Sequence, residues 1–137
     1  MITPKNFLIV IIATIAVSVA ILLNPINNAA DFSNFVFDAV YLEADNSILI
    51  TFSDQNKKSS YAVLEILGME TTYHEEFEII DSNFSQIVPL EQLPKYGWKT
   101  MPVTLEITYD ENEIIKMKTE IHDEGQQSPE IIFGFGN

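Results

Sequence analysis

Apolar and polar residues divide the chain into two parts with different patterns. Residues 7–23 carry no charge, and Ile26 extends this apolar run to about the twenty residues that cross a bilayer core. We therefore predict a transmembrane helix over residues 7–26, which would hold the protein in the lipid bilayer. Residues 1–6 precede it, and residues 27–34 form a short polar tether to the remaining chain.

The charges on either side of this run predict its orientation. Lys5 lies before the run, whereas Asp31 and Asp38 follow it. The positive-inside rule then places the amino terminus in the cytoplasm and the remaining chain outside the cytoplasmic membrane. The alternative is a cleaved signal peptide ending near residues 29–30, but the apolar region of such a peptide is usually only about 7–15 residues long. A retained single-pass anchor is therefore preferred, and both interpretations export the domain.

One face of the predicted helix carries small residues. Helical spacing brings together Ala13, Ala16 and Ala20, with Thr14 and Ser18 beside them. Small residues let two helices approach closely, and hydroxyl groups form hydrogen bonds across the contact. This face predicts a second membrane helix as a partner. The alternative is that it faces only lipid.

After residue 34 the apolar pattern changes to a period of two, which is typical of strands. Strands are predicted at residues 35–42, 48–53, 61–67, 71–80, 84–88, 103–110 and 113–121. Turns rich in Asp, Asn and Ser separate several of them. The run 61–67 (YAVLEIL) is apolar at nearly every position, so we expect it to be buried on both faces. Residues 89–94 are expected to form a connection or a single helical turn.

These short strands, with no amphipathic helix between them, predict an antiparallel β-sandwich over residues 35–123. The stretch Phe77–Thr108 combines a strand, a turn, a second strand ending in Pro-Leu, a Tyr-Gly-Trp corner and a long alternating strand. In this order it resembles immunoglobulin-like and fibronectin type III-like exported domains. The resemblance implies a mainly β, immunoglobulin-like fold, although the chain lacks the Cys…Trp…Cys signature of antibody domains.

Residues 124–137 form a tail with a polar first part and an apolar second part. A polar, glycine-containing break at residues 124–129 is followed by the apolar sequence EIIFGFGN. This end could add an edge strand to its own domain, or it could dock on another subunit as an extended arm. The side chains expected to make such a contact are those of Ile131, Ile132, Phe133 and Phe135.

The charge and composition exclude several classes of function. The 137-residue chain carries a formal net charge of −13. All 20 acidic residues lie at or after residue 31 with six of the seven lysines, so the exported part carries −14, and arginine is absent. This acidic balance argues against binding to nucleic acid or to anionic lipid headgroups. The absence of cysteine excludes disulfides, thiolate metal ligands and cysteine nucleophiles. The usage of Ile, Asn and Lys is typical of an archaeon or an AT-rich prokaryote.

Few residues suggest chemistry. His74 shares a strand face with Glu76, and His122 precedes Asp123, so the two segments could hold zinc or copper if they paired. Two surface histidines among many acids are, however, more often plain surface residues. Neither a phosphate-cradling glycine loop nor a Gly-x-Ser-x-Gly elbow occurs. We therefore predict no catalytic residue and no cofactor.

Two further short motifs lie at residues 96–98 and 83–85. Tyr96-Gly97-Trp98 is either a stacking platform for a sugar or a protein, or core aromatics beside a turn glycine. Asn83-Phe84-Ser85 matches the N-glycosylation pattern, with Asn83 as the acceptor.

The predicted function is that of a non-catalytic subunit of a larger membrane protein complex. In construction the chain resembles accessory single-span subunits of archaeal membrane enzymes, among which ammonia monooxygenase is a candidate host. This resemblance implies integral membrane subunits as partners. The alternatives are a free-standing cell-surface binding module and, third, an exported metal-delivery domain that uses the two histidines.

Overall fold

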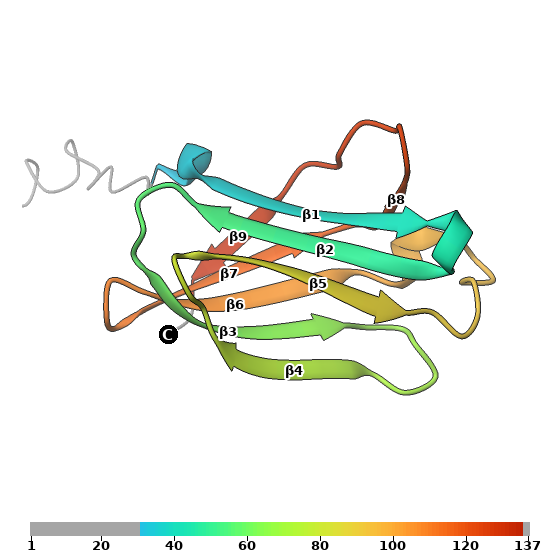
Figure 1. Ribbon diagram of the computed structural model, residues 1–137, viewed down its shortest axis with the longest axis horizontal. Helices are drawn as coiled ribbons and strands as arrows, with labels where there is room; N and C mark the ends of the chain where they lie inside the picture. Colours follow the sequence, from blue (N-terminus) through green and yellow to red (C-terminus); the bar gives the residue numbers. More distant parts are fainter. Residues whose placement is uncertain (1–30, 136–137) are drawn as a thin grey trace, which may run out of the picture. The chain divides into compact units, whose positions relative to one another are not determined.

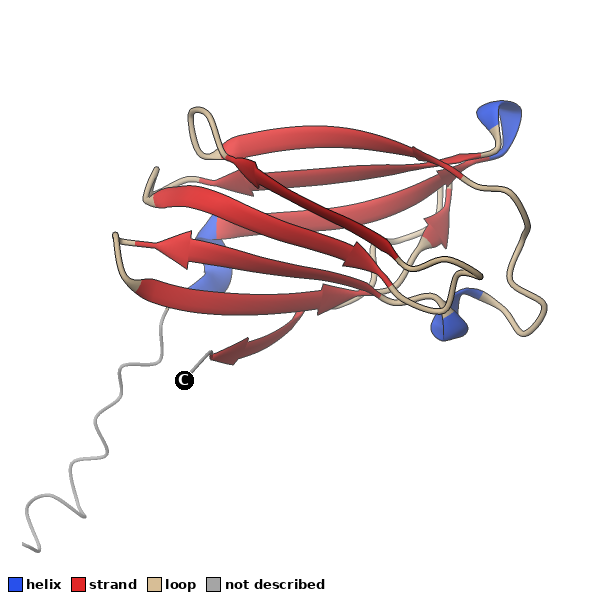
Figure 2. Cartoon of the chain, turned by 90° about the horizontal axis from the view of Figure 1, so that it is seen from below, coloured by secondary structure: helices blue, strands red, loops and turns tan. Residues whose placement is uncertain are grey.

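The computed structural model describes residues 31–135 (Figure 1). Strand is the main secondary structure of this part, and the helical pieces are short turns beside strand ends (Figure 2). The strands are β1 (Phe35–Leu42), β2 (Ser47–Asp54), β3 (Ser59–Ile66), β4 (Tyr73–Glu78), β5 (Asn83–Pro89), β6 (Val103–Tyr109), β7 (Glu113–Thr119), β8 (His122–Asp123) and β9 (Ile132–Phe135). The 3-10 helices are η1 (Phe32–Asn34), η2 (Glu43–Asp45) and η3 (Trp98–Thr100).

The helix predicted at residues 7–26 lies outside the described residues. Within residues 31–135, none of the helices is long and apolar enough to cross a bilayer.

The nine strands form two sheets. One has the order β5-β2-β1-β8 and the other the order β4-β3-β6-β7-β9. Neighbouring strands are antiparallel except β1 and β8, which run parallel with Val40 opposite His122. The prediction of a mainly β, largely antiparallel fold is therefore confirmed for this part of the chain.

Alternation along the strands builds one core from both sheets. In β1, Phe35, Phe37 and Ala39 are buried, as the period of two predicted, whereas Val36 between them is 48% exposed. The buried ring of Phe35 lies 5.6 Å from that of Tyr109 in β6 (centroid to centroid), so the inward faces of the two sheets contact each other. Ile and Leu side chains of β2, β3, β6 and β7 fill the rest of this core.

The run at residues 61–67 corrects one prediction. We expected burial on both faces, but only Ala62, Leu64 and Ile66 are buried, while Tyr61 is 36% and Leu67 37% exposed. The apolar content of the run reflects a half-covered outward face rather than a central strand enclosed on both sides.

Other boundaries differ by a few residues. The strand expected at residues 71–80 is limited to Tyr73–Glu78. Before it, Gly68 turns the chain at φ +79°, and a β carbon there would lie 2.0 Å from the carbonyl oxygen of Thr100. In the part described, the connection after β5 forms its one helical turn at Trp98–Thr100 and not at residues 89–94.

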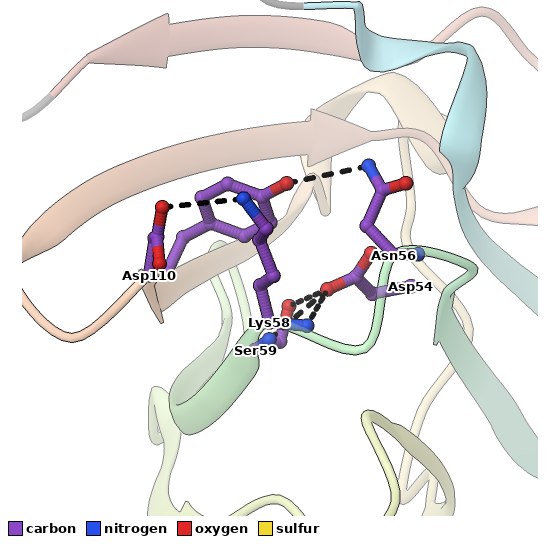
Figure 3. Close-up of polar contacts among 6 residues, drawn as sticks. Asp54, Asn56, Lys58, Ser59 and Asp110 are labelled. Carbon is purple, nitrogen blue, oxygen red and sulfur yellow. Dashed lines mark hydrogen bonds and ion pairs between the residues drawn. The ribbon is translucent and has the colours of Figure 1, made fainter.

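A buried carboxylate organises the turn between β2 and β3 (Figure 3). Asp54 is 3% exposed. One of its oxygens accepts the backbone N–H of Asn56 at 2.8 Å, and the other accepts the N–H of Lys58 at 2.9 Å. That second oxygen also accepts both the N–H of Ser59 at 3.0 Å and its hydroxyl at 2.8 Å. Four donors around one anion fix the path of this turn.

The apolar tail adds a strand to its own domain. Strand β9 pairs antiparallel with β7, with Phe133 opposite Met117 and Phe135 opposite Ile115. The ring of Phe133 lies 6.3 Å from that of Phe35 across the core. β9 is therefore the outermost strand of the five-stranded sheet, and its backbone is paired on the side of β7.

Candidate interaction face

The outward face of the five-stranded sheet is charged. In β3, β6 and β7, buried residues alternate with more exposed ones, most of which are polar. In β4, half-buried residues alternate with the exposed His74, Glu76 and Glu78. The outward ionisable side chains are Glu65, His74, Glu76, Glu78, Glu106, Lys116 and Lys118. Such a face is well hydrated in isolation, and burying it would cost the hydration of several ions.

The outward face of the four-stranded sheet differs sharply. We call the outward side of β1, β2 and β5 the uncharged face. Of its twelve side-chain positions only one, Asp38, is charged. The strand register places Ile87, Leu49 and Val40 in one row across β5, β2 and β1. Serine, threonine and asparagine occupy much of the remaining surface.

Two apolar side chains of the uncharged face are strongly exposed. Ile87 is 59% and Val36 48% exposed. Exposed apolar residues are ordinary when scattered singly. Here they belong to a continuous face with one charged residue, whereas the outward face of the other sheet carries seven ionisable side chains beside the exposed Tyr61 and Ile132. That combination is typical of a surface that contacts another protein.

The single charged residue of this face is bonded to a buried histidine at the edge of the sheet. His122 of β8 is 7% exposed, and its Nε2 lies 2.9 Å from a carboxylate oxygen of Asp38. The other ring nitrogen, Nδ1, lies 3.0 Å from the carbonyl oxygen of Asp123. Ser128 donates a hydrogen bond of 3.1 Å to the second oxygen of Asp38. The carboxylate thus joins β8 and the polar break at residues 124–129 to β1.

This cluster does not have the order of a serine triad. In a triad the histidine stands between the serine and the carboxylate, so that it can remove the proton of the serine. Here Asp38 stands between His122 and Ser128. The arrangement therefore has a structural use, which is to fasten two segments that lie far apart in the chain.

The two histidines lie in different sheets, so their two segments do not pair as a shared metal site would require. His74 is on β4 and His122 on β8. The ring nitrogens of His74 lie 2.8 Å from a carboxylate oxygen of Glu65 and 3.0 Å from one of Glu76. Hydrogen bonds to Glu65 and then to Glu76 raise the pKa of His74 above 6.5. Across residues 31–135, no three His, Cys, Asp or Glu side chains are arranged to hold a metal ion.

Asp123, considered above as a metal ligand beside His122, is instead bonded to Trp98. Its carboxylate accepts a hydrogen bond of 3.1 Å from the indole N–H of Trp98. The indole also lies 5.0 Å from the ring of Tyr41 (centroid to centroid). Trp98 is half-buried and joins the β5–β6 connection to the ends of β1 and β8, whereas Tyr96 is 78% exposed.

The remaining predicted residues are spread over the molecule. Asn83 is exposed at the start of β5, on the rim of the uncharged face. In the tail, Ile132 is 62% exposed and Phe133 half-buried, with Ile131 just before β9. The helix positions Ala13, Thr14, Ala16, Ser18 and Ala20 lie outside the described residues.

Sequence reasoning missed the uncharged face. Its signal was present in the residues that alternate with the core positions of three strands, such as Val36, Val40, Leu49 and Ile87. Those strands are adjacent in space but not all adjacent in the chain, because β5 pairs with β2 across two intervening strands. The face becomes visible only when the register is known.

Comparisons with known protein families, with characterised proteins and with solved structures return no match to this chain.

Proposed function

We propose that this protein is a non-catalytic, membrane-anchored subunit whose extracytoplasmic domain packs against a larger integral membrane protein and stabilises it. The observation that carries the proposal is the uncharged face on β1, β2 and β5. A domain that served only to stay soluble would have no need to keep one whole sheet surface nearly free of ions.

The energetics favour this face over the opposite one. The centres of protein interfaces are depleted of charged residues, because each ion must lose its water on binding. On the uncharged face Asp38 already has a buried histidine partner 2.9 Å away. A partner covering this sheet would therefore bury apolar and hydroxyl groups and leave the charged sheet exposed to solvent.

The anchor supplies the second contact in this proposal. The apolar residues 7–26 span the cytoplasmic membrane once, with the domain outside the cell, and the alanines at positions 13, 16 and 20 pack on a helix of the partner. An archaeal membrane enzyme such as ammonia monooxygenase is the proposed kind of host. Protease added to intact cells or right-side-out spheroplasts should remove the domain, whereas protection until lysis would contradict this topology.

We also propose that the domain is an immunoglobulin-like sandwich. In that arrangement the first, second and fifth strands share one sheet, and the third, sixth and seventh share the other. Strands β1, β2 and β5, and strands β3, β6 and β7, follow this division. The fourth strand departs from the constant-type pattern because it pairs with β3 instead of β5. Strands β8 and β9 extend the two sheets at their outer edges.

The test introduces a charge into the uncharged face. Ile87→Glu places a carboxylate on the proposed interface at its most exposed apolar position, in strand β5, and we expect it to abolish stoichiometric co-purification with the larger membrane protein in mild detergent. Ile80→Glu is the matched control, because Ile80 is 78% exposed in the turn between β4 and β5 and is not one of the twelve positions of the uncharged face. It should co-purify like the parent.

A second variant addresses the anchor. Ala16→Leu should weaken the same association through a steric clash between helices, without changing membrane insertion or the β domain. Deletion of the tail is a poor test, because β9 is paired with β7 and its loss would disturb the core. The proposal fails if the parent protein is a lone monomer in several mild detergents, or if Ile87→Glu and Ile80→Glu behave alike.

A further inference from the structure

A cavity of about 610 Å³ lies between the β3–β4 loop and the connection that follows β5. Figure 1 shows both segments at the same end of the sheets, opposite the end at which the chain enters β1. Sites for small molecules usually have volumes of about 300–1,000 Å³ and apolar linings with a few polar groups. The cavity falls within that range of size.

The floor of the cavity is part of the hydrophobic core. Val88, Leu90 and Met101 line it and are 2%, 3% and 2% exposed. Leu93, 58% exposed, forms an apolar wall near the opening. An apolar group that entered here would contact core side chains and would displace water from apolar surface.

One wall of the cavity is held by a close backbone contact. Gly68 packs so tightly on the carbonyl of Thr100 that no side chain fits between them. The β3–β4 loop is thereby fixed to the segment that carries Met101. The contact holds the β3–β4 loop against Met101, so this part of the lining is in place without a ligand.

The charges at the opening are mainly negative. Glu70 and Glu91 line the cavity and are exposed, and neither makes an ion pair or a hydrogen bond within the part of the chain that the structure describes. Lys95 also lines it, but its ammonium group lies 5.5 Å from the centroid of the Tyr96 ring. The imidazole of His74 is already bonded to two other carboxylates.

We propose that this cavity binds a small organic cation, namely an amine with an aromatic or branched aliphatic body. The body enters the apolar floor formed by Val88, Leu90 and Met101, and the ammonium group stays at the opening between Glu70 and Glu91. The proposal does not rest on the accessory-subunit function, because the cavity is lined by loops at one end of the domain and shares only Pro89 with the uncharged face.

The methionines provide a direct measurement. Met69 and Met101 line the cavity, whereas Met117 lies in β7 and does not. The full chain, labelled with methyl-¹³C methionine in a non-ionic detergent, is titrated with 2-phenylethylamine, 2-phenylethanol and 3-phenylpropionate. These probes share an aromatic body and differ in charge. We expect saturable shifts of the Met69 and Met101 methyl signals and a constant Met117 signal.

The order of affinities tests the chemical class. The amine should bind about three- to tenfold more tightly than the alcohol, as expected for two exposed charge interactions, and the carboxylate should bind most weakly. Glu70→Gln combined with Glu91→Gln should remove the preference for the amine. Glu111→Gln combined with Glu124→Gln makes the same change in net charge elsewhere and should keep the preference.

Three results would overturn the proposal. The first is that none of the probes gives a saturable shift of Met69 or Met101. The second is that Met117 shifts as much as they do, which would indicate general solvation in detergent. The third is that amine and carboxylate bind equally to the parent protein.

Discussion

Replacing Asp54 with alanine should destabilise the domain by removing the acceptor around which the β2–β3 turn is built. The carboxylate accepts four hydrogen bonds, from three backbone N–H groups and one hydroxyl. The N–H groups of Asn56 and Lys58 belong to exposed residues and can bond to water instead. Both donors of Ser59 belong to a residue that is only 5% exposed, so they would stay unsatisfied.

The magnitude follows from these two buried donors. An unsatisfied buried donor costs about 1–3 kcal/mol. Because the turn can relax, we expect Asp54→Ala to lower the free energy of unfolding by about 3 kcal/mol, in the lower half of the range for two donors. This is a large fraction of the roughly 5–15 kcal/mol that stabilises a typical domain.

Asparagine at position 54 should cost less. Its side-chain carbonyl can face the three donors on the side of Ser59, which leaves its amide group near the exposed N–H of Asn56. The charge and one exposed hydrogen bond are lost, and we expect a decrease of about 1 kcal/mol. A free energy of unfolding that is lowest for Asp54→Ala, intermediate for Asp54→Asn and highest for the parent is therefore expected if buried donors hold the turn.

Urea unfolding of the full chain in mild detergent, followed by the fluorescence of Trp98, measures these differences. Trp98 is the chain's single tryptophan. Asp110→Asn is the control, because it removes the exposed ion pair of 3.2 Å with Lys58 in the same region, and it should cost less than about 0.5 kcal/mol. The reasoning is refuted if Asp54→Ala lies within about 0.5 kcal/mol of the parent, or if Asp54→Asn is the less stable of the two.

Three shorter predictions concern other polar groups. Histidine-resolved NMR should show that the pKa of His74 lies above 6.5, because of its bonds to Glu65 and then Glu76. Its stabilising contribution is then complete below pH 6.5 and is lost as the pH rises through the folded-state pKa, and Glu65→Gln should lower that pKa. Within residues 31–135 the hydroxyl of Thr119 is buried without a hydrogen-bond partner, so Thr119→Val should raise the free energy of unfolding by about 1 kcal/mol. A lower free energy of unfolding, measured with urea, would contradict this. Burial and the bond to the Glu75 carboxylate raise the pKa of Tyr73 to about 12. The phenolate absorbance of Tyr73 should therefore develop late, and its contribution to stability, complete below pH 10, should be lost as the pH rises through about 12.

Local pattern was enough to predict most strands of the domain. The alternation of Val103, Leu105 and Ile107 with polar residues predicted β6 to within one residue, and the same reasoning predicted β1 and β7 closely. Each of these strands has one buried and one solvent-exposed face, and only then do apolar and polar residues alternate with a period of two. The prediction that residues 61–67 are buried on both faces failed because most outward residues of this run are apolar although they are partly exposed.

Features that depend on distant pairing could not be predicted. Strand β8 has only two residues, and it exists because His122 lies beside Val40 of the first strand. The two histidines are separated because β4 and β8 belong to different sheets. The residues around each histidine in the sequence do not indicate to which sheet it belongs. The uncharged face and the loop cavity depend on the same long-range information, because each joins segments from different parts of the chain.

The parallel pairing of β1 with β8 sets the order in which the domain can be completed during synthesis. The ribosome releases β1 and β2 early, and they can form their hairpin at once. The other edge of β1, however, receives its partner only when residues 122–123 appear, and the bonds from His122 and Ser128 to Asp38 span 84 and 90 positions. Contacts at such separation form slowly, because a long loop must close before they stabilise anything. Until residues 122–128 are in place, β1 therefore keeps one edge of unpaired backbone groups, which is open to pairing with a strand of another chain.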